Sequence, residues 1–554
     1  MTDIRRTLLW VVFTMSLVLL WDAWNKHTGQ PSLFGSASTS QPSAAPGSAA
    51  SGVPAPSPSG APVPTTGSAP PAALPIPTPT AGEVVAVTTD LARVSFDTAG
   101  ASIVKVELLK YRDQLDPRQN VVVFDRSAQR QYVAQSGLVG VTGAPTHLSR
   151  FSVAPGDRSL QAGHDTLSVR FESAEAGGIK LVKTFSLKRG DYTIGVKHEV
   201  VNEGTTPVAP QLYVQLVRDG NAPAGESSFY FTFTGPAIYN DASKFKKVAF
   251  GDIEKGDTAY DRSANDGWVA MVQHYFASAW LHTAPGPREF YTRKVDANLY
   301  SVGMLFPVGT VEPGATRSLD HVLFVGPQEE KKLEALAPGL ELVKDYGWVT
   351  ILAKPLFWLL DKVHKVLGNW GWSIVALVVL LKIAFYWLNA SAYRSMAKMK
   401  AVNPRVMEMR ERHKDNPQQM QQEMMRIYRE EKVNPLGGCL PILVQIPFFI
   451  ALYWVLLSSV EMRQAPWIGW ITDLSAKDPY YILPLLMTAS TLLQTWLNPT
   501  PPDPVQARMM WIMPLVFSVM FFIFPAGLVL YWLTNNLLSI AQQWTINRSL
   551  GVGK

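Results

Sequence analysis

The sequence predicts a multi-domain α+β membrane protein in which an exported β-sandwich precedes a polytopic bundle, giving six transmembrane helices in all. The averages over 554 residues, 47% hydrophobic and 17% charged, hide two unlike halves. Residues 83–330 alternate polar and apolar side chains with a period of two. Residues 345–546 carry apolar runs of near-spanning length between short polar loops. A further apolar run lies near the N-terminus.

The first element is this N-terminal run, within residues 1–30. Arg5 and Arg6 precede it, a pattern that secretory signal peptides and uncleaved anchors share. A signal peptide needs small residues directly after its apolar core, but bulky residues, including Trp21 and Trp24, stand there. The pattern therefore favours an uncleaved anchor with a cytoplasmic basic end, so that the following chain is exported.

A tether and a β-sandwich follow the anchor. Residues 31–82 are almost entirely Pro, Ala, Ser, Gly and Thr, which is typical of a disordered or polyproline spacer. Residues 83–330 show strand-like alternation, as at Tyr192, Ile194 and Val196, bounded by Gly, Asp and Pro. Such a pattern predicts a β-sandwich in the exported part of the chain.

Aromatic residues of this domain gather at residues 229–231 and between Trp268 and Trp280, where His274, Tyr275 and Phe276 also lie. They either line a carbohydrate or peptide cleft or, as their spacing favours, belong to the core. The sequence has no HExxH, GxSxG, CxxC or Walker motif, so we expect no enzyme, cofactor or metal site. Its single cysteine, Cys439, allows no disulfide within the chain.

Apolar and amphipathic helices make up the second half. Residues 340–367 predict a helix that lies in the membrane interface and is interrupted at Pro355. Residues 370–546 are predicted to form the membrane core. The prediction depends on five apolar segments: residues 370–388, 437–460, 480–498, 509–524 and 528–546.

The loops between these segments differ in charge. Residues 389–435 contain ten Lys or Arg, whereas residues 461–479 contain only Arg463 and Lys477. Since positively charged loops stay inside, the first loop is cytoplasmic and the second is external. Both termini, including the tail at residues 547–554, are then cytoplasmic. The net charge of +6 reflects this asymmetry, and no DNA partner is expected.

Lys382 is the only charged residue in the segment 370–388. A cation within the bilayer costs roughly 3 kcal/mol and usually faces a bundle interior or a wet cavity. The alternative is snorkelling toward the interface near Tyr386 and Trp387. Helical spacing puts Asn389 on the same face as Lys382. Polar residues of the spans lie mainly in their cytoplasmic halves and predict, with Lys382, a groove open to the cytoplasm: Asn389, Gln445, Thr491, Thr495, Thr534, Asn535, Asn536 and Ser539.

Other functions fit this pattern less well. Interhelical hydrogen bonds account for some of these polar residues, but not for a lysine without an acidic residue in the spans. A channel needs polar lining along its full depth, and a solute transporter usually has internal repeats with broken helices. Neither is present in the sequence. An anchored sugar-binding protein would need an acid pair or an aromatic platform in a sandwich cleft.

Long segments of the chain are similar to the YidC/Oxa/Alb family. In the second half they are NPLGGCLPILVQIPFFIALYWVL (434–456), RQAPWIGWITDLSAKDPYYILPLLM (463–487) and PAGLVLYWLTNNLLSIAQQ (525–543). In the first half they are TTDLARVSFDTAGASIVKVELLKY (88–111) and GWVAMVQHYFASAW (267–280), which resemble the periplasmic domain of Gram-negative members. The similarity covers nearly the whole chain except the tether.

The resemblance implies a function and a fold. It implies insertion and folding of nascent inner-membrane proteins, alone or with the Sec translocon, by a five-helix insertase core and a periplasmic β-supersandwich. The ribosome, the signal recognition particle receptor and membrane lipids are candidate partners. Family members commonly have arginine in the groove where this chain has Lys382, which keeps the charge without a bidentate fork. An apolar face along which clients slide is expected at Phe448, Phe449, Tyr531 and Trp532.

The cytoplasmic loop, residues 389–435, predicts a hairpin of two helices. Val402, Val406 and Met409 follow one helical face, Met420, Met424 and Ile427 follow another, and residues 415–417 break the pattern. These apolar residues either pack within the hairpin or offer an adaptable surface to clients, as the additional Met396, Met399, Met407 and Met425 suggest.

Overall fold

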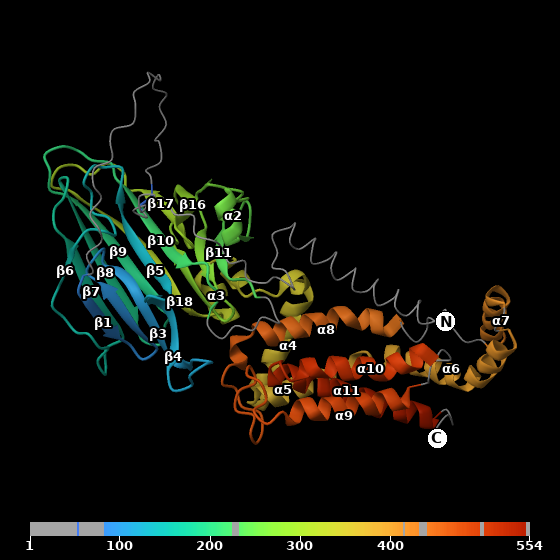
Figure 1. The fold of residues 1–554 in the computed structure, drawn as a ribbon. Coiled ribbons are helices and arrows are strands. Elements are labelled where there is room, and N and C mark those ends of the chain that lie inside the picture. Colours follow the sequence, from blue (N-terminus) through green and yellow to red (C-terminus); the bar gives the residue numbers. More distant parts are fainter. Residues whose placement is uncertain are drawn as a thin grey trace. The chain divides into compact units, whose positions relative to one another are not determined.

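The computed structural model describes residues 53–54, 82–223, 232–413, 416–431, 440–498 and 504–549. The described chain forms two compact units, with the boundary between Lys344 and Asp345 (Figure 1). The predicted anchor, nearly all of the tether, the aromatic residues 229–231, Cys439 and the end of the tail lie outside the described residues.

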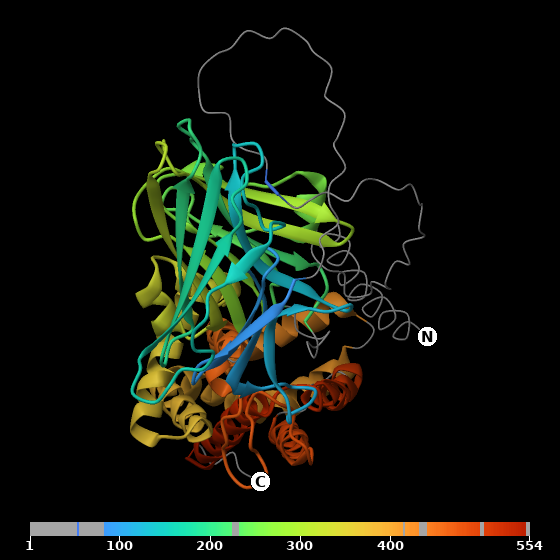
Figure 2. The same cartoon turned by 90° about the vertical axis from the view of Figure 1, so that its left-hand side faces the viewer.

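The first unit is a sandwich of two antiparallel sheets with nine strands each (Figures 1 and 2). In spatial order, the first sheet contains β1 (Val84–Thr88), β2 (Ala92–Asp97), β3 (Ser102–Arg112), β4 (Asn120–Arg126), β5 (Gln131–Val139), β10 (Gln211–Asp219), β17 (Leu299–Pro307), β16 (Arg288–Asp296) and β13 (Ser263–Ala264).

The second sheet contains β12 (Lys246–Lys247), β11 (Gly235–Tyr239), β14 (Trp268–Val272), β15 (Phe276–Leu281), β18 (Thr316–Pro327), β9 (Thr193–Asn202), β8 (Ile179–Lys188), β7 (Thr166–Ser173) and β6 (Phe151–Val153). Short helices complete this unit: α2 (Phe250–Lys255), α3 (Glu330–Leu336) and the 3₁₀ helix η1 (Leu340–Val343).

The core of the sandwich lies between the sheets, where alternate residues of each strand meet. On β9, Ile194 and Val196 are buried, as their alternation predicts. The indole N–H of Trp280 donates to the carbonyl of Gln215 on the opposite sheet at 3.1 Å. The Tyr132 hydroxyl lies 2.6 Å from the hydroxyl of Ser278, again across the sheets. A β-sandwich followed by a helical region is therefore confirmed, whereas the count of six transmembrane helices stays a prediction.

The second unit is helical where the structure describes it. Its elements are η2 (Gly347–Val349), α4 (Thr350–Leu367), α5 (Trp370–Ala384), α6 (Tyr386–Arg412), α7 (Pro417–Glu430), α8 (Leu440–Ser458), η3 (Val460–Met462), α9 (Ile482–Leu497), α10 (Pro504–Phe521) and α11 (Ala526–Ser549).

Two expectations for this unit were wrong in detail. Pro355 does not interrupt α4, because it lies in the second turn of a helix that continues to Leu367. Proline lacks a backbone N–H to donate at this position, but it does not end the helix. The segment 370–388 is not one straight helix either, since the chain bends by 66° between α5 and α6. At the break, Phe385 has φ −92° and ψ 12°, outside the helical range.

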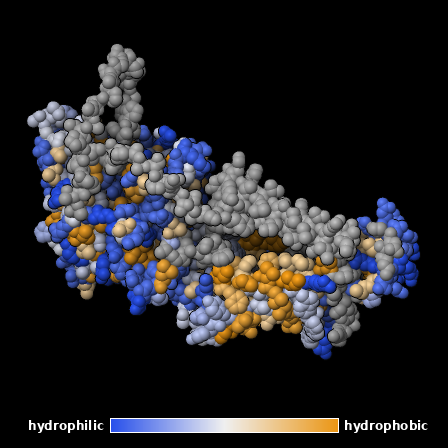
Figure 3. All heavy atoms as spheres, in the orientation of Figure 1, coloured by the Kyte–Doolittle hydropathy of each residue, from blue (hydrophilic) through white to orange (hydrophobic). Residues whose placement is uncertain are grey.

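Length and apolarity of the described helices bear on membrane crossing. By these two criteria no single described helix is sufficient, but the bent pair Trp370–Ala384 and Tyr386–Ser395 passes them together. Shorter apolar helices lie at Val444–Ser458, Ile482–Leu497 and Ala507–Phe521. Figure 3 shows a continuous apolar area on this unit, although the end that carries α7 is hydrophilic, and α10 exposes Ile512, Val516 and Val519. An exposed apolar surface of this extent is typical of a lipid or protein contact.

Candidate functional site

The start of α5, the helix that carries Lys382, is fixed by the loop between η3 and α9. The side-chain oxygen of Asn369 caps α5 by accepting from the backbone N–H of Trp372 at 3.0 Å. Gly371 allows the Trp467 ring to lie against the helix, because a Cβ at this position would stand 2.3 Å from Cδ1 of that ring. The loop therefore sets the position of α5 in the bundle.

Lys382 contacts α11 near the other end of α5. Its Nζ donates to the hydroxyl of Ser539 at 2.7 Å, and that hydroxyl donates to the carbonyl of Asn535 at 2.8 Å. The Tyr393 side chain from α6 also forms a hydrogen bond with Ser539. Within the described part of the chain, the partner of the Lys382 ammonium is thus a neutral hydroxyl rather than a carboxylate.

A small cavity lies beside Lys382 between α5, α8 and α11. It measures about 20 Å³, enough for about one water molecule. Its lining combines three of the predicted groove residues with three of the predicted apolar face: Lys382, Gln445, Asn535, Phe448, Phe449 and Tyr531. Phe385, from the bend, also lines it, with its ring 5.0 Å from that of Phe448. The structure therefore brings polar and apolar candidates together.

The remaining predicted groove residues lie in other surroundings. Asn536 is buried, and its Nδ2 donates to the hydroxyl of Ser490 at 2.8 Å, which links α11 to α9. Three threonine hydroxyls bond to carbonyls one turn earlier in their own helices, namely those of Thr491, Thr495 and Thr534. Interhelical and intrahelical bonding thus accounts for these four residues.

Two predicted site residues, Asn389 and Trp532, do not line this cavity. Asn389 does not share a helical face with Lys382, because the bend at Phe385 separates α5 from α6. Its side chain is buried, and Nδ2 has no hydrogen-bond partner among the described residues. Trp532 is not among the cavity-lining residues, and its ring lies 5.1 Å from that of Phe521 and 5.3 Å from that of Phe524.

Sequence reasoning missed Ser490, Tyr393 and Phe385. Ser490 precedes Thr491, so a search for polar residues on α9 would have found it, although only the packing of α9 on α11 pairs it with Asn536. Tyr393 lies in the basic loop segment rather than in a predicted span. Phe385 shows no signal in the sequence, because neither proline nor glycine marks the bend.

The helical hairpin contains an apolar cluster of its own. Val406, Met409 and Ile427 are buried in it together with Val402, and Met420 and Met424 pack against them. Asn416 caps α7 by accepting from the backbone N–H of Gln419. Two further methionines point outward: Met407 is 47% exposed and Met425 is 45% exposed. The predicted apolar set therefore holds the two helices together, and other methionines form the outer surface.

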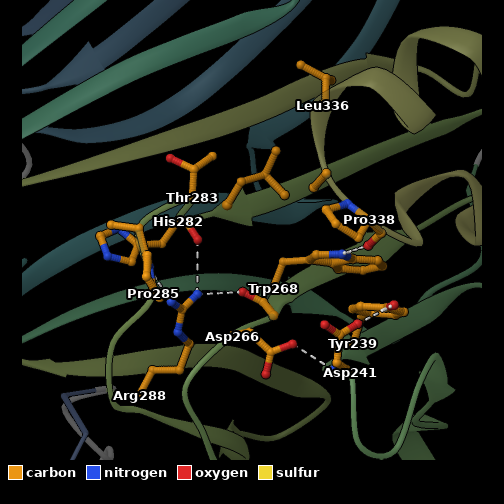
Figure 4. A pocket seen from close by; sticks show the side chains of 14 residues that line it. Tyr239, Asp241, Asp266, Trp268, His282, Thr283, Pro285, Arg288, Leu336 and Pro338 are labelled. Carbon is orange, nitrogen blue, oxygen red and sulfur yellow. Dashed lines mark hydrogen bonds between the residues drawn. The ribbon is translucent and has the colours of Figure 1, made fainter.

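The aromatic residues from Trp268 to Trp280 mostly belong to the core of the sandwich. Trp268 is buried, and its ring stacks on Tyr239 at 5.5 Å beside a cavity of about 210 Å³ (Figure 4). The polar groups around this cavity already have partners within the domain. The Tyr239 hydroxyl donates to Asp241, and the Arg288 guanidinium donates to several backbone carbonyls, such as that of Gly267 at 2.8 Å. Across the described residues, no group of His, Cys, Asp or Glu is arranged to hold a metal ion.

Comparisons with known proteins cover both units. Residues 84–359 match the family model described as YidC periplasmic domain, and residues 362–552 match that of the 60Kd inner membrane protein. The chain is 56% identical over 553 residues to a protein of Cupriavidus necator named "Membrane protein insertase YidC". It is 57% identical over 557 residues to one of the same name from Cupriavidus taiwanensis. In both cases the match covers 100% of this chain and 99% of the relative.

Among solved structures, the chain is similar to one titled "Active YidC insertase crystal structure with the first transmembrane domain resolved". The sequence identity is 19%, and the match covers 83% of this chain and 91% of the other, with a TM-score of 0.38.

Proposed function

This chain belongs to the YidC family of membrane protein insertases, and we propose that it inserts and folds inner-membrane proteins through a groove that opens to the cytoplasm. Its relatives are inner-membrane proteins, and the matched models include a periplasmic domain. It is an insertase and not an enzyme. The proposed mechanism needs no nucleotide, because transfer of about 20 apolar residues into lipid is itself favourable.

The observation that carries the proposal is the contact between Lys382 and Ser539 at the edge of a mixed polar and apolar cavity. The ammonium is bound by a neutral hydroxyl at 2.7 Å. A carboxylate of a client is a stronger acceptor for a charged donor than a hydroxyl is. In the proposed mechanism an acidic residue of the exported segment replaces Ser539 as the acceptor, while Gln445 and Asn535 supply further polar groups.

The apolar wall of the cavity suits the hydrophobic segment of a client. Phe448 and Phe449 on α8 face the same cavity as Tyr531 on α11, and the Phe449 and Tyr531 rings lie 5.9 Å apart. We infer that the client slides along these side chains into lipid. Because the cavity holds only about one water molecule, it has to widen first. The bend at Phe385 between α5 and α6 is the hinge that we assign to this widening.

The proposed topology has six spans with both termini in the cytoplasm. It is supported by the basic loop 389–435 and by the sparse charge of the loop 461–479. In this topology the hairpin of α6 and α7 lies in the cytoplasm and receives clients. Its arginines suit acidic surfaces of the ribosome or of the signal recognition particle receptor, and the Sec translocon and membrane lipids are the expected membrane partners.

Site-specific photocrosslinking to a stalled nascent membrane protein tests the function. A photoreactive residue at Gln445 or Asn535 should crosslink to the client, because both positions line the cavity. Val519 provides the control, since it is 64% exposed on α10, a helix that does not line the cavity. Equal crosslinking at Val519 and Asn535 would argue against a defined path through the cavity.

A further inference from the structure

The outer face of the first sheet carries an apolar cluster formed by Val139, Tyr213 and Leu305. Its direction follows from the strand register. Tyr132 reaches across to Ser278 of the second sheet, and Tyr132 stands opposite Arg218, so even-numbered residues of β10 face inward. Tyr213, at an odd position, points away from the second sheet, and Leu305 stands opposite it. A cluster this apolar on an outer face needs a cover.

The cover comes from the Pro/Ala/Ser-rich tether. Val53 packs against the cluster of Val139, Tyr213 and Leu305, and the following Pro54 is buried. The Arg293 guanidinium on β16 donates from Nη1 to the backbone carbonyl of Val53 at 2.8 Å. This dipeptide precedes the first strand of the sandwich in sequence. Its valine side chain fills an apolar position, and its valine carbonyl accepts a hydrogen bond from Arg293 on the same surface.

The surface around this dipeptide is built in detail. Tyr291 packs against the same cluster, and its hydroxyl donates to Oε1 of Gln215 at 2.9 Å. Its ring can lie over β17 because residue 303 is glycine, where a Cβ would stand 2.4 Å from the Tyr291 hydroxyl. The guanidinium of Arg293 lies 5.8 Å from the centre of the Tyr291 ring. Gly303, Tyr291 and Arg293 together form one side of the surface on which Val53 lies.

Beyond Pro54 the surface continues as a cavity of about 400 Å³. Tyr260 stands at its rim, where its hydroxyl accepts from the backbone N–H of Thr292 at 2.8 Å. Apolar Ile253 and Phe290 also contribute to the lining. Aromatic side chains that present flat faces, next to a donor for a backbone carbonyl, are the common means of binding proline-rich segments.

We propose that this surface is a binding site for a Val-Pro dipeptide and that its occupant is Val53-Pro54 of the same chain. Proline has no N–H to leave unsatisfied on an apolar surface, and its fixed φ reduces the entropy lost on binding. Val53 supplies the apolar side chain, and its carbonyl supplies the acceptor for Arg293. The site is a latch that ties the tether to the sandwich.

The latch shortens the reach of the tether. A polyproline chain as long as segment 31–82 would extend over about 160 Å, whereas one as long as segment 31–53 would extend over about 70 Å. Binding of Val53 therefore shortens the length of chain between residue 31 and the sandwich. Because the dipeptide belongs to the same chain, its effective concentration at the site is on the order of millimolar, so a weak contact suffices to keep it bound.

Photocrosslinking in the full-length protein tests the latch. A photoreactive residue replaces Thr258, which lines the cavity, and mass spectrometry identifies the crosslinked tether peptide. We expect the main product to contain Val53, and Val53→Asp to lower its yield by about tenfold, because a carboxylate is costly on the apolar cluster. Val63→Asp is the matched control, since Val63-Pro64 is a second Val-Pro dipeptide of the tether. It should leave the yield unchanged.

A labelled peptide covering residues 49–59 provides an independent readout. It should bind to the Val53→Asp protein and about tenfold more weakly to the wild type, where the tether competes. Arg293→Ala combined with Val53→Asp should abolish its binding. An equal loss of crosslinking in Val53→Asp and Val63→Asp, or equal peptide binding by wild type and Val53→Asp, would overturn the proposal. Unchanged thermal unfolding of the Val53→Asp protein would exclude a folding defect.

Discussion

At the scale of single residues, Lys382 is a cation held by a neutral partner in an apolar helix. Its contact with Ser539 satisfies one N–H without neutralising the charge. Since an isolated cation in this environment is costly, a ligand carboxylate that compensates it is bound favourably. This reasoning supports the proposal that Lys382 binds acidic residues of clients, since its partner in the described chain is not a carboxylate.

We therefore predict a graded effect of Lys382 substitutions on insertion. Lys382→Arg should retain activity, whereas Lys382→Glu should lower insertion of a client with an acidic exported segment by about tenfold or more, because attraction becomes repulsion. Lys382→Ala should lie between them. Insertion is measured by protease protection of the exported segment, with a client lacking acidic residues there as the control. Equal insertion of the acidic client by wild type and Lys382→Glu would instead support snorkelling.

A second group of residues, buried in the sandwich, leads us to expect a stability that depends on pH. Lys183 is fully buried and donates to the carbonyls of Gly100 at 2.6 Å and Ser136 at 2.7 Å. Burial lowers the pKa of Lys183 to about 7. Burial, and then the charge of Lys183, holds the pKa of His198 well below its usual value. Burial does the same to the pKa of His321, with smaller effects of His198, His282 and Arg288.

The sign of the pH effect follows from these lowered pKa values. As pH falls from about 10.5 to 7, the unfolded chain protonates Lys183 while the folded chain does not, so stability decreases. Below about pH 6.5 the same holds for His198 and His321. We predict that Lys183→Met weakens the loss of stability between pH 9 and 7, by up to about 1.4 kcal/mol per pH unit.

The stability at each pH is measured by thermal unfolding, monitored through the circular dichroism signal of the β-sheets. His321→Phe should reduce the further loss below about pH 6.5. Exposed residues of the same types provide the controls, and Lys188→Met and His164→Phe should leave the pH profile unchanged. An identical pH profile for wild type, Lys183→Met and His321→Phe would show that these groups do not determine the pH dependence.

At the scale of elements, the hairpin of α6 and α7 has a buried apolar cluster and, apart from it, exposed methionines. Its buried cluster, with Val406 and Ile427, holds the helices together, while Met407 and Met425 remain exposed. Unbranched methionine side chains adapt to many apolar sequences. The exposed methionines are therefore the better candidates for contact with clients.

We predict that replacing Met407 and Met425 together with serine lowers crosslinking of the hairpin to nascent clients severalfold without unfolding it, because only exposed side chains change. Gln421→Ser, at another exposed position, is the control. Replacing residues 402–432 with a Gly/Ser linker should abolish insertion while the membrane bundle still assembles. Normal insertion by the linker variant would refute a receiving role for the hairpin.

The elements also show which structural features the sequence pattern was sufficient to predict. Alternation along β9 predicted its buried side, because one face of each strand meets the core. Burial of Lys183 could not be predicted, since its acceptors, Gly100 and Ser136, belong to the other half of the sandwich. Lys382 was found because a lone charge in an apolar segment is rare. Its hydrogen-bond partner Ser539 was one of eight predicted polar groove residues, and the bend at Phe385 places Asn389 on a different helix from Lys382.

At the scale of the whole molecule, the proposed six spans fix the side of each loop. In a Cys439→Ser background, cysteines at Arg410 and Asp473 should react with a membrane-impermeant thiol reagent from opposite sides. The reason is that loop 389–435 contains many more Lys and Arg residues than loop 461–479, and positively charged loops stay in the cytoplasm. Labelling in intact spheroplasts and in inverted vesicles distinguishes the sides. Reaction of both cysteines from one side would exclude the proposed topology.

The division into two units also predicts that the sandwich is dispensable for the insertion step. The cavity beside Lys382 is lined by residues of α5, α8 and α11, all within the helical unit. A deletion has to remove complete sheets, because β18 pairs with both β9 and β15 in the second sheet and would otherwise expose an apolar strand. Residues 83–327 meet this condition.

We therefore expect the protein without residues 83–327 to insert clients at a rate within about twofold of the wild type, since no cavity residue is removed. Depletion of the native protein and complementation by the deletion variant measure this, with Lys382→Glu in the same shortened chain as the inactive control. Stable production of the remaining spans has to be verified by immunoblotting. If these spans accumulate normally but insertion is lost, the sandwich itself takes part in the insertion step.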